Sequence, residues 1–238
     1  MKIETNHIVK KYGDKVVLDL NGQYSRLLFE SGKITGIIGS NGSGKTTLMK
    51  IMAGLISAID GEVRYDGQTF DQDIAMKITY ANQRPVLFSR SIYENIAYPL
   101  RIRKYPEEKI NRIVRGLLEE FEIADIQKQN AKHLSGGESQ KTALARALSF
   151  SPEVVFLDEP TASIDPKSVQ VIEAALKRRN ADTGLTVIII THNLAQAFRL
   201  CDRLVLLNQG ECLLYDTTEK MRQAQNTTIQ EFISFNAF

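Results

Sequence analysis

The sequence predicts an α/β fold in which a mostly parallel sheet carries helices on both faces. After residue 152, strand-sized apolar runs alternate with helical patterns, which is typical of parallel strands joined by crossover helices. A β-rich run at 33–38 also leads directly into a glycine-rich loop and a helix. We expect a single domain in which residues 1–83 and 152–238 form the core and residues 84–151 form an inserted α-helical subdomain.

The expected elements can be placed by their periodicity. Alternating apolar residues at 3–9 and 15–18, with a turn between them, predict an antiparallel β region near the N-terminus. Helical spacing, with Pro106 at a first-turn position, predicts helices at 45–55, 91–101, 106–121, 137–150, 168–179 and 194–200. Apolar runs predict strands at 33–38, 154–157, 186–190 and 203–207.

Composition excludes several classes of protein. The chain has 30 basic and 28 acidic residues, and its formal charge of +2 gives no field that would attract nucleic acid by itself. Its apolar runs are far shorter than the roughly 20 residues of a membrane-spanning helix, and its polar N-terminus is unlike a signal peptide. Cys201 and Cys212 lack metal-ligand spacing and are expected to be small core residues. We therefore expect a cytoplasmic protein that binds no nucleic acid.

A glycine-rich loop carries the strongest functional signal. Gly39 and Gly44 fit the pattern of a phosphate-binding loop, or P-loop, that ends in Lys45 and Thr46. Positions without side chains let successive backbone N–H groups converge on a phosphate, and the start of a helix adds its dipole. Lys45 would bridge two phosphates of a nucleotide, and the Thr46 hydroxyl would hold Mg²⁺. The expected binding residues are Gly39, Ser40, Asn41, Gly42, Ser43, Gly44, Lys45, Thr46 and Thr47.

Two carboxylates follow the apolar run at 154–157. Asp158 and Glu159 stand at the C-terminal end of this expected strand, where ligands bind in open α/β sheets. Adjacent side chains of a strand point to opposite faces, so the two acids should have different roles. Asp158 suits the coordination shell of Mg²⁺, and Glu159 suits a general base that polarises an attacking water. A solvated turn before Pro160 is the alternative interpretation.

Two further candidate sites stand at the ends of expected elements. His192 follows the apolar run at 187–190 and could reach a terminal phosphate or the attacking water, although a lone histidine is more often structural. Ser135, Gly136 and Gly137 open an expected helix and form either an ordinary N-cap or a second anion site. The residues alone leave open why one chain would need two phosphate-binding loops.

Together these motifs resemble those of the ATP-binding-cassette (ABC) ATPases, the nucleotide-binding subunits of membrane transporters, over essentially the whole chain. The motifs, in order, are the loop 39–46, the Gln83 loop 81–85, the signature 134–140, Asp158 with Glu159, the loop 163–165, and His192. The resemblance implies ATP hydrolysis by a head-to-tail homodimer. Each ATP would lie between the P-loop of one copy and residues 135–137 of a second copy.

The resemblance also implies roles for single residues. Tyr12 would stack on the adenine, Gln83 would sense Mg²⁺ and water, and Asp165 would cross the dimer interface. Tyr12 could instead cover the core. The expected catalytic residues are Lys45, Gln83, Glu159 and His192. Three positions depart from the usual family pattern without removing a catalytic group, namely Glu138, Lys141 and Ile164.

The segment 84–98 resembles that of bacterial importers of small solutes, notably oxyanions such as tungstate, molybdate or phosphate, and of amino acids. In these systems the region receives a short helix of a membrane permease, and a solute-binding protein takes part indirectly. The apolar residues that could form the receiving groove are Val86, Leu87, Phe88, Ile92 and Tyr93. Ile92 and Ile96, at helical spacing, fit the core of the subdomain better. The protein would then be peripheral on the inner face of the cell membrane.

Two other functions compete with this interpretation. A soluble ABC ATPase that acts on nucleic acid or ribosomes usually carries a long coiled-coil insert or two cassettes, whereas this chain has one compact cassette. A nucleotide-binding regulator without hydrolysis is disfavoured by Glu159 and His192. Because the chain ends soon after Phe232, we expect no additional C-terminal regulatory domain.

Overall fold

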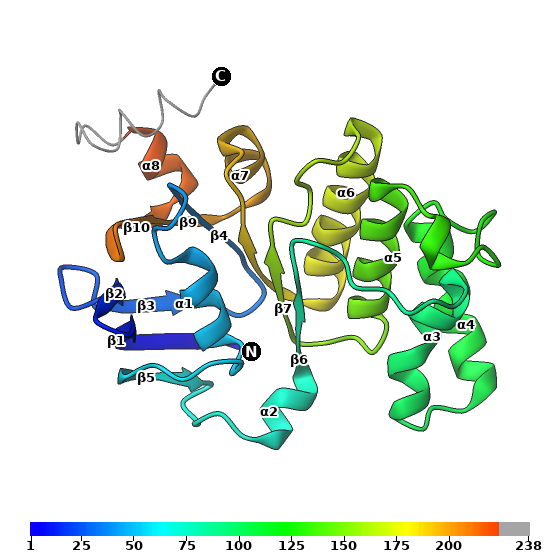
Figure 1. The fold of residues 1–238 in the computed structure, drawn as a ribbon, viewed down its shortest axis with the longest axis horizontal. Coiled ribbons are helices and arrows are strands. Elements are labelled where there is room, and N and C mark those ends of the chain that lie inside the picture. Colours follow the sequence, from blue (N-terminus) through cyan, green and yellow to red (C-terminus); the bar gives the residue numbers. More distant parts are fainter. Residues whose placement is uncertain (224–238) are drawn as a thin grey trace.

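The computed structural model describes residues 1–223, which form two sheets with helices packed around them (Figure 1). The larger sheet has the strand order β10-β9-β4-β8-β7-β6. Its strands from β9 to β6 are parallel, and β10 pairs antiparallel with β9 at one edge. The bounds of these strands are β4 Ile34–Gly39, β6 Ile78–Ala81, β7 Val154–Asp158, β8 Thr186–Ile190, β9 Arg203–Asn208 and β10 Glu211–Thr217. The mostly parallel sheet predicted from the sequence is confirmed.

The smaller sheet is antiparallel and is built from the N-terminal part of the chain. Its central strand β1 (Ile3–Tyr12) pairs with β2 (Lys15–Asp19), β3 (Arg26–Phe29) and β5 (Asp60–Tyr65). The sequence predicted β1 and β2 but not the other two. β3 is apolar but has only four residues, and β5 is mostly exposed and has no clear apolar pattern.

Helices cover both faces of the parallel sheet. The α-helices are α1 Lys45–Met52, α2 Gln72–Lys77, α3 Ile92–Ile102, α4 Glu107–Glu120, α5 Gly136–Leu148, α6 Pro166–Thr183, α7 Leu194–Leu200 and α8 Thr218–Gln223. Alternate residues of β7 pack into two different hydrophobic cores. Val154 and Phe156 pack with α1 and the antiparallel sheet, whereas Val155 and Leu157 pack with the helices of the other face.

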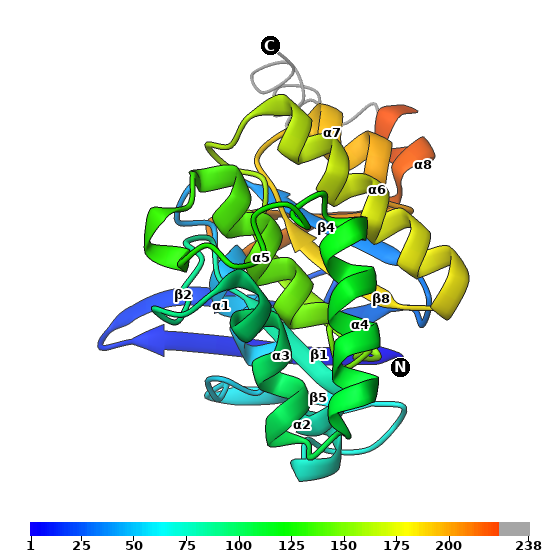
Figure 2. The same cartoon turned by 90° about the vertical axis from the view of Figure 1, so that its right-hand side faces the viewer.

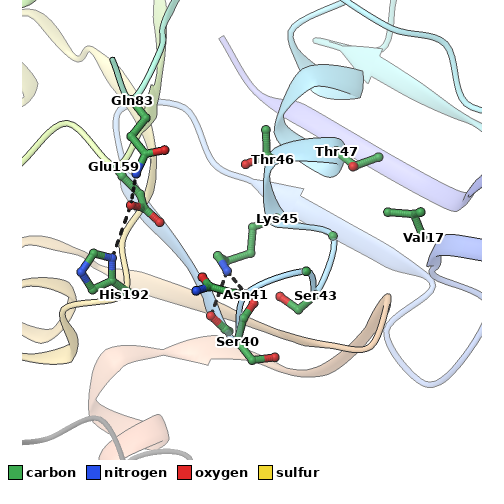
Figure 3. A pocket seen from close by; sticks show the side chains of 13 residues that line it. Val17, Ser40, Asn41, Ser43, Lys45, Thr46, Thr47, Gln83, Glu159 and His192 are labelled. Carbon is green, nitrogen blue, oxygen red and sulfur yellow. Dashed lines mark hydrogen bonds and ion pairs between the residues drawn. The ribbon is translucent and has the colours of Figure 1, made fainter. Parts of the chain in front are cut away.

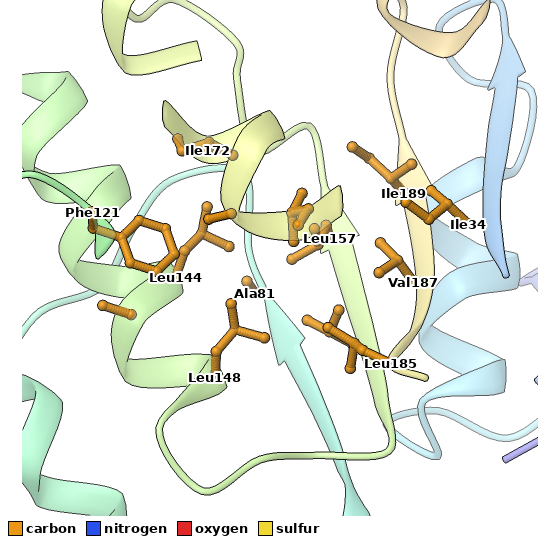
Figure 4. Close-up of a cluster of buried hydrophobic side chains, with 14 of the residues drawn as sticks. Ile34, Ala81, Phe121, Leu144, Leu148, Leu157, Ile172, Leu185, Val187 and Ile189 are labelled. Carbon is orange, nitrogen blue, oxygen red and sulfur yellow. The ribbon is translucent and has the colours of Figure 1, made fainter. Parts of the chain in front are cut away.

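Helices α3, α4 and α5 stand between β6 and β7 in the chain and, with α6, form the near side of the molecule in Figure 2. Their buried side chains do not form a separate core. Phe121, Leu144 and Leu148 belong to the same cluster as Leu157 and Ile189 of the sheet, as Figure 4 shows. The division into a core and a helical subdomain stays a prediction, since the packing between them is continuous.

Several boundaries differ from the sequence predictions. Pro106 is the N-cap of α4 and lies before its first turn, since its backbone is still extended (ψ 142°). Helix α5 begins one residue earlier than expected, at Gly136, because Ser135 caps it.

Among the described residues no helix is both long and apolar enough to cross a membrane. Phe232 lies outside the described residues.

Candidate active site

The glycine-rich loop connects β4 to α1, and two of its glycines are required by its shape. Gly39 has φ 147°, and a Cβ there would lie 2.1 Å from the carbonyl oxygen of Leu207. Gly44 has φ 98°, and its Cβ would lie 2.9 Å from the carbonyl oxygen of Val17. Gly44 is also the N-cap of α1, and no side chain in the described part of the chain caps that helix. The first N–H groups of α1 are therefore available to an anion.

Lys45 is held inside this loop. Its side chain is buried, and Nζ donates to the carbonyl oxygens of Gly39 (2.9 Å) and Ser40 (2.8 Å). Burial lowers the pKa of Lys45, while the nearby charges of Glu159 and Asp158 act to raise it. Within residues 1–223 the buried Ser43 hydroxyl has no hydrogen-bond partner. A cation and an unsatisfied hydroxyl in one loop fit a phosphate ligand.

Asp158 lies beside Thr46 at the start of α1. The Thr46 hydroxyl is 3.1 Å from Asp158 Oδ2, and Tyr80 donates to the same carboxylate oxygen at 3.0 Å. Burial, then the charge of Asp158 and the hydrogen bond to it, raise the pKa of Tyr80, so the phenol stays a donor. A hydroxyl and a carboxylate this close offer two oxygen ligands, the type that Mg²⁺ prefers.

Glu159 leaves the strand, so the predicted alternation of faces does not apply to it. β7 ends at Asp158, and Glu159 has φ 48°, a left-handed conformation that is unfavourable for a glutamate. This turn directs its carboxylate toward the P-loop cavity. Gln83 Nε2 donates to Glu159 Oε2 at 2.7 Å, and His192 Nδ1 lies 3.4 Å from the same oxygen. Gln83 and His192 thus meet at the carboxylate of Glu159, and all three residues were singled out in the sequence.

A cavity of about 800 Å³ joins these groups (Figure 3). In Figure 3 the side chains of Gln83, Glu159 and His192 lie on one side of the cavity, facing Lys45. The lining residues are Val17, Gly39, Ser40, Asn41, Gly42, Ser43, Gly44, Lys45, Thr46, Thr47, Gln83, Glu159 and His192. Sequence reasoning missed Val17, because an apolar residue of a short strand carries no functional signal of its own.

Four expected site residues lie elsewhere, in a second group. A Cβ on Gly137 would lie 2.3 Å from the Ser168 hydroxyl and 2.6 Å from Asp165 Oδ2, so the start of α5 packs directly on the start of α6. Asp165 is the N-cap of α6 and accepts from the Ser168 backbone at 2.9 Å. Ser135 caps α5. Residues 135–137 and Asp165 are therefore neighbours, and none of them lines the P-loop cavity.

Tyr12 also lies outside the lining of the cavity. It ends β1, its side chain is 54% exposed, and Lys10 Nζ lies 5.4 Å from the centre of its ring. Tyr12 is therefore not a buried residue. The alternative interpretation, in which its ring covers the core from outside, stays open. Its contact with adenine stays a prediction.

A phosphate-binding loop between a parallel strand and a helix, with carboxylates at the end of a neighbouring strand, defines the class of P-loop nucleotide hydrolases. A family model described as ABC transporter matches residues 24–162. The chain belongs to this family, and it is an ATP-binding and ATP-hydrolysing subunit of the ABC type.

Relatives agree on this assignment. The chain is 44% identical to the tungstate uptake system ATP-binding protein TupC of Peptoclostridium acidaminophilum, over 88% of this chain and 96% of that protein. It is 35% identical to the methionine import ATP-binding protein MetN of Legionella pneumophila, over 88% of this chain but only 62% of that protein. It is 34% identical to the spermidine/putrescine import protein PotA of Bacteroides thetaiotaomicron, of which it spans 45%.

Solved structures share the fold. CbiO1 of Clostridium perfringens, part of an ABC transporter complex, superimposes with a TM-score of 0.84 at 26% identity, over 98% of this chain and 94% of that one. A dimeric ATP-binding cassette solved in a post-hydrolysis state with ADP and Pi gives a TM-score of 0.80 at 28% identity, over 91% and 98%.

Proposed function

We propose that this chain energises the import of a small solute, in preference an oxyanion such as tungstate, molybdate or phosphate, through a separate membrane permease. The observation that carries the ATPase assignment is the convergence of Gln83, Glu159 and His192 on the cavity that the P-loop lines. The oxyanion preference is supported by the 44% identity to a tungstate uptake subunit over nearly its whole length. Amino-acid import is the second candidate, because a methionine import subunit is 35% identical.

Most residues of the cavity, and Asp158 beside it, have a part in this proposal. The backbone of Gly39 to Gly44 and the start of α1 bind the phosphates, and Lys45 neutralises their charge. Glu159 takes a proton from the attacking water, while Gln83 and His192 orient that water and the terminal phosphate. Thr46, Asp158 and Gln83 would hold Mg²⁺, which would shield the negative charge of the phosphates. The 3.1 Å approach of Thr46 to Asp158 supports this ligand set.

A second copy of the chain would complete the site. Residues 135–137 and Asp165 form one surface apart from the cavity, which suits a head-to-tail dimer in which this surface covers the nucleotide of the other copy. The dimeric state of the similar ATP-binding cassette supports the formation of a dimer. ATP would close the dimer, and hydrolysis would release it.

The permease would contact an exposed apolar surface next to the Gln83 loop. Val86 is 71% exposed, and Phe88 packs against Tyr98 with ring centres 4.5 Å apart, both partly exposed. Ile92 and Ile96 are fully buried, as the sequence predicted, so they belong to the core and not to this surface. Contact with a permease would make the protein peripheral on the inner face of the membrane, with a solute-binding protein acting indirectly.

The decisive experiment replaces the general base. Glu159→Gln keeps the shape and the contact with Gln83 but removes the negative charge, so ATP should still bind and a stable ATP-bound dimer should accumulate. Hydrolysis should fall by roughly 100-fold or more. Glu153→Gln, just before the same strand and outside the cavity, is the matched control and should hydrolyse ATP normally. Normal turnover by Glu159→Gln would exclude the assigned role.

The partner can be tested separately. Purification of the tagged protein from membranes should retain a polytopic membrane protein, and ATP hydrolysis of that complex should respond to a binding protein loaded with the solute. Recovery with ribosomes or nucleic acid instead would favour the soluble alternative. Stimulation by tungstate-loaded but not methionine-loaded binding protein would decide between the two classes of solute.

A further inference from the structure

A buried carboxylate behind the active site has no place in the mechanism above. Glu173, in the middle of α6, is only 7% exposed. Its Oε1 accepts from Gln196 Nε2 (2.9 Å) and Arg199 Nη2 (2.7 Å), and its Oε2 accepts from Arg199 Nε (2.9 Å). Burial acts to raise the pKa of Glu173, but the hydrogen bonds from Arg199 and Gln196 hold it below the ordinary value. The carboxylate is therefore ionised and tied to α7.

The Gln196 side chain extends this contact toward the active site. Gln196 is 2% exposed, and its Oε1 accepts from the Thr191 hydroxyl at 2.8 Å. The Thr161 hydroxyl lies within hydrogen-bond distance of both ends of the same amide, 2.9 Å from Nε2, which donates to it, and 3.0 Å from Oε1, which can accept from it. Thr191 immediately precedes His192, and Thr161 lies two residues after Glu159. One amide thus joins three segments that are far apart in the chain. We call Thr161, Glu173, Thr191, Gln196 and Arg199 the Gln196 cluster.

This cluster faces the catalytic pair across a small cavity. The cavity has a volume of about 220 Å³, and it is lined by Glu159 and His192 together with Thr161, Gln196 and Arg199. The Glu159 backbone is also fixed to the neighbouring strand, because its N–H donates to the Ile190 carbonyl at 3.0 Å. The left-handed residue Glu159 is therefore followed closely by the contact of Thr161 with Gln196, and its own N–H is bound to Ile190.

We infer that Gln196, oriented by Glu173, is a positioning residue for ATP hydrolysis: it holds the segments that carry Glu159 and His192 at the distance and orientation that the attacking water requires. The inference rests on the catalytic roles proposed for Glu159 and His192. The inference also links the Gln196 cluster to the dimer. Helix α6 carries Glu173, and its N-cap Asp165 lies on the surface proposed to meet the second copy. Docking of that copy would then be transmitted to the catalytic pair through α6 and Gln196.

A merely structural role for the cluster predicts a different result. Loss of a buried hydrogen bond lowers stability wherever it occurs, but it leaves the turnover of the folded protein unchanged. Loss of a positioning contact lowers turnover at temperatures where the protein is fully folded, and it leaves nucleotide affinity unchanged, since no atom of the Gln196 cluster lines the P-loop cavity. A fall in kcat without a change in KM, measured on the folded protein, therefore separates the two roles.

Thr161 offers the sharpest pair of variants. Thr161→Val has nearly the same shape but no hydroxyl, whereas Thr161→Ser keeps the hydroxyl. Thr161→Val should lower kcat by about tenfold, with KM for ATP and affinity for ADP within about twofold of the parent. Thr161→Ser should restore most of the turnover. Equal kcat for Thr161→Val and the parent, or an equal loss for both variants, would overturn the inference.

A double-mutant cycle tests whether the contact acts through Gln196. Gln196→Met keeps the length of the side chain and removes both hydrogen-bonding groups. If Thr161 acts through Gln196, the combined variant should lose no more turnover than Gln196→Met alone. Losses that multiply would show independent effects and contradict the inference. All turnover is measured well below the lowest melting temperature of the set.

Failure of this inference can be distinguished from failure of the proposed function. If Glu159→Gln still hydrolyses ATP at the parent rate, the catalytic assignment is wrong, whatever Thr161 does. If Glu159→Gln is inactive while Thr161→Val turns over normally, the catalytic assignment stands and the role of Gln196 is wrong.

Discussion

The N-termini of α1 and α5 are both expected to meet phosphate, but their backbone donors are in different situations. At α1 the N-cap is Gly44, and no described side chain accepts from its first N–H groups. At α5 the N-cap Ser135 and Glu138 form a capping box. The Ser135 hydroxyl accepts from the Glu138 backbone at 3.3 Å, and the Glu138 carboxylate accepts from the Ser135 backbone and hydroxyl, each at 2.7 Å.

This difference indicates two kinds of phosphate site. An uncapped helix start presents its N–H groups and its dipole directly to an anion, whereas a capping box already satisfies part of them. Glu138 also places a negative charge at the surface proposed to meet the phosphates of a second copy. Closure of the dimer would therefore have to displace the Glu138 carboxylate from Ser135, while the first N–H groups of α1 need no such exchange.

The largest effect is expected at the α1 site. Lys45→Ala removes the buried cation, and a lost charge-assisted hydrogen bond should weaken ATP binding by roughly 10- to 100-fold. Equilibrium binding of a fluorescent ATP analogue measures this change. Lys50→Ala, in the last turn of the same helix and outside the cavity lining, is the control. Unchanged affinity for ATP in Lys45→Ala would show that Lys45 does not bind the phosphates at the start of α1.

A smaller effect of opposite sign is expected at α5. Glu138→Gln keeps a side chain that can complete the capping box but removes its charge. The ATP-bound dimer, accumulated in the Glu159→Gln background, should tighten by about two- to fivefold, as expected for one charge near a helix start. Analytical ultracentrifugation measures the dissociation constant of the dimer. Weaker dimerisation would mean that the Glu138 charge helps closure, and our contrast between the two helices would be wrong.

The smallest effect concerns stability and pH. Hydrogen bonds from the Ser135 hydroxyl and backbone hold the pKa of Glu138 below its ordinary value. A carboxyl with a lowered folded-state pKa stabilises the fold above its unfolded-state pKa, about 4.3, and this stabilisation is lost as the pH falls through the folded-state pKa. The difference in urea midpoint between the parent and Glu138→Gln should therefore be present at pH 7 and shrink below about pH 4. A constant difference would contradict this.

The sequence predicted those parts of the fold whose signal is local. Strands β4, β7 and β8 are fully buried and rich in Ile, Val, Leu or Phe, and the P-loop residues are consecutive in the chain. Helix α2 was missed because it has six residues and buries only Ile74. Strand β5 was missed because it is defined by its pairing with β1, which no local pattern records.

The same limit applies to the site. Gln83, Glu159 and His192 could be singled out because each belongs to a recognisable motif, although the left-handed turn at Glu159 could not be predicted from strand periodicity. The Gln196 cluster had no such signal. Glu173 looks like a solvated residue of an amphipathic helix, and its contact with Gln196 joins positions 23 residues apart. Only the folded chain brings this glutamate and glutamine behind Glu159 and His192.

The continuous core between the helices α3 to α5 and the parallel sheet restricts how such chains can diverge. Because Phe121 and Leu148 share one buried cluster with Leu157 and Ile189, residues 84–151 are not an interchangeable module. A chimera that took this segment from a relative in order to address another permease would also need the matching side chains of β7 and β8. Changes of partner should therefore arise more easily by substitution at exposed positions such as Val86 than by exchange of the whole segment.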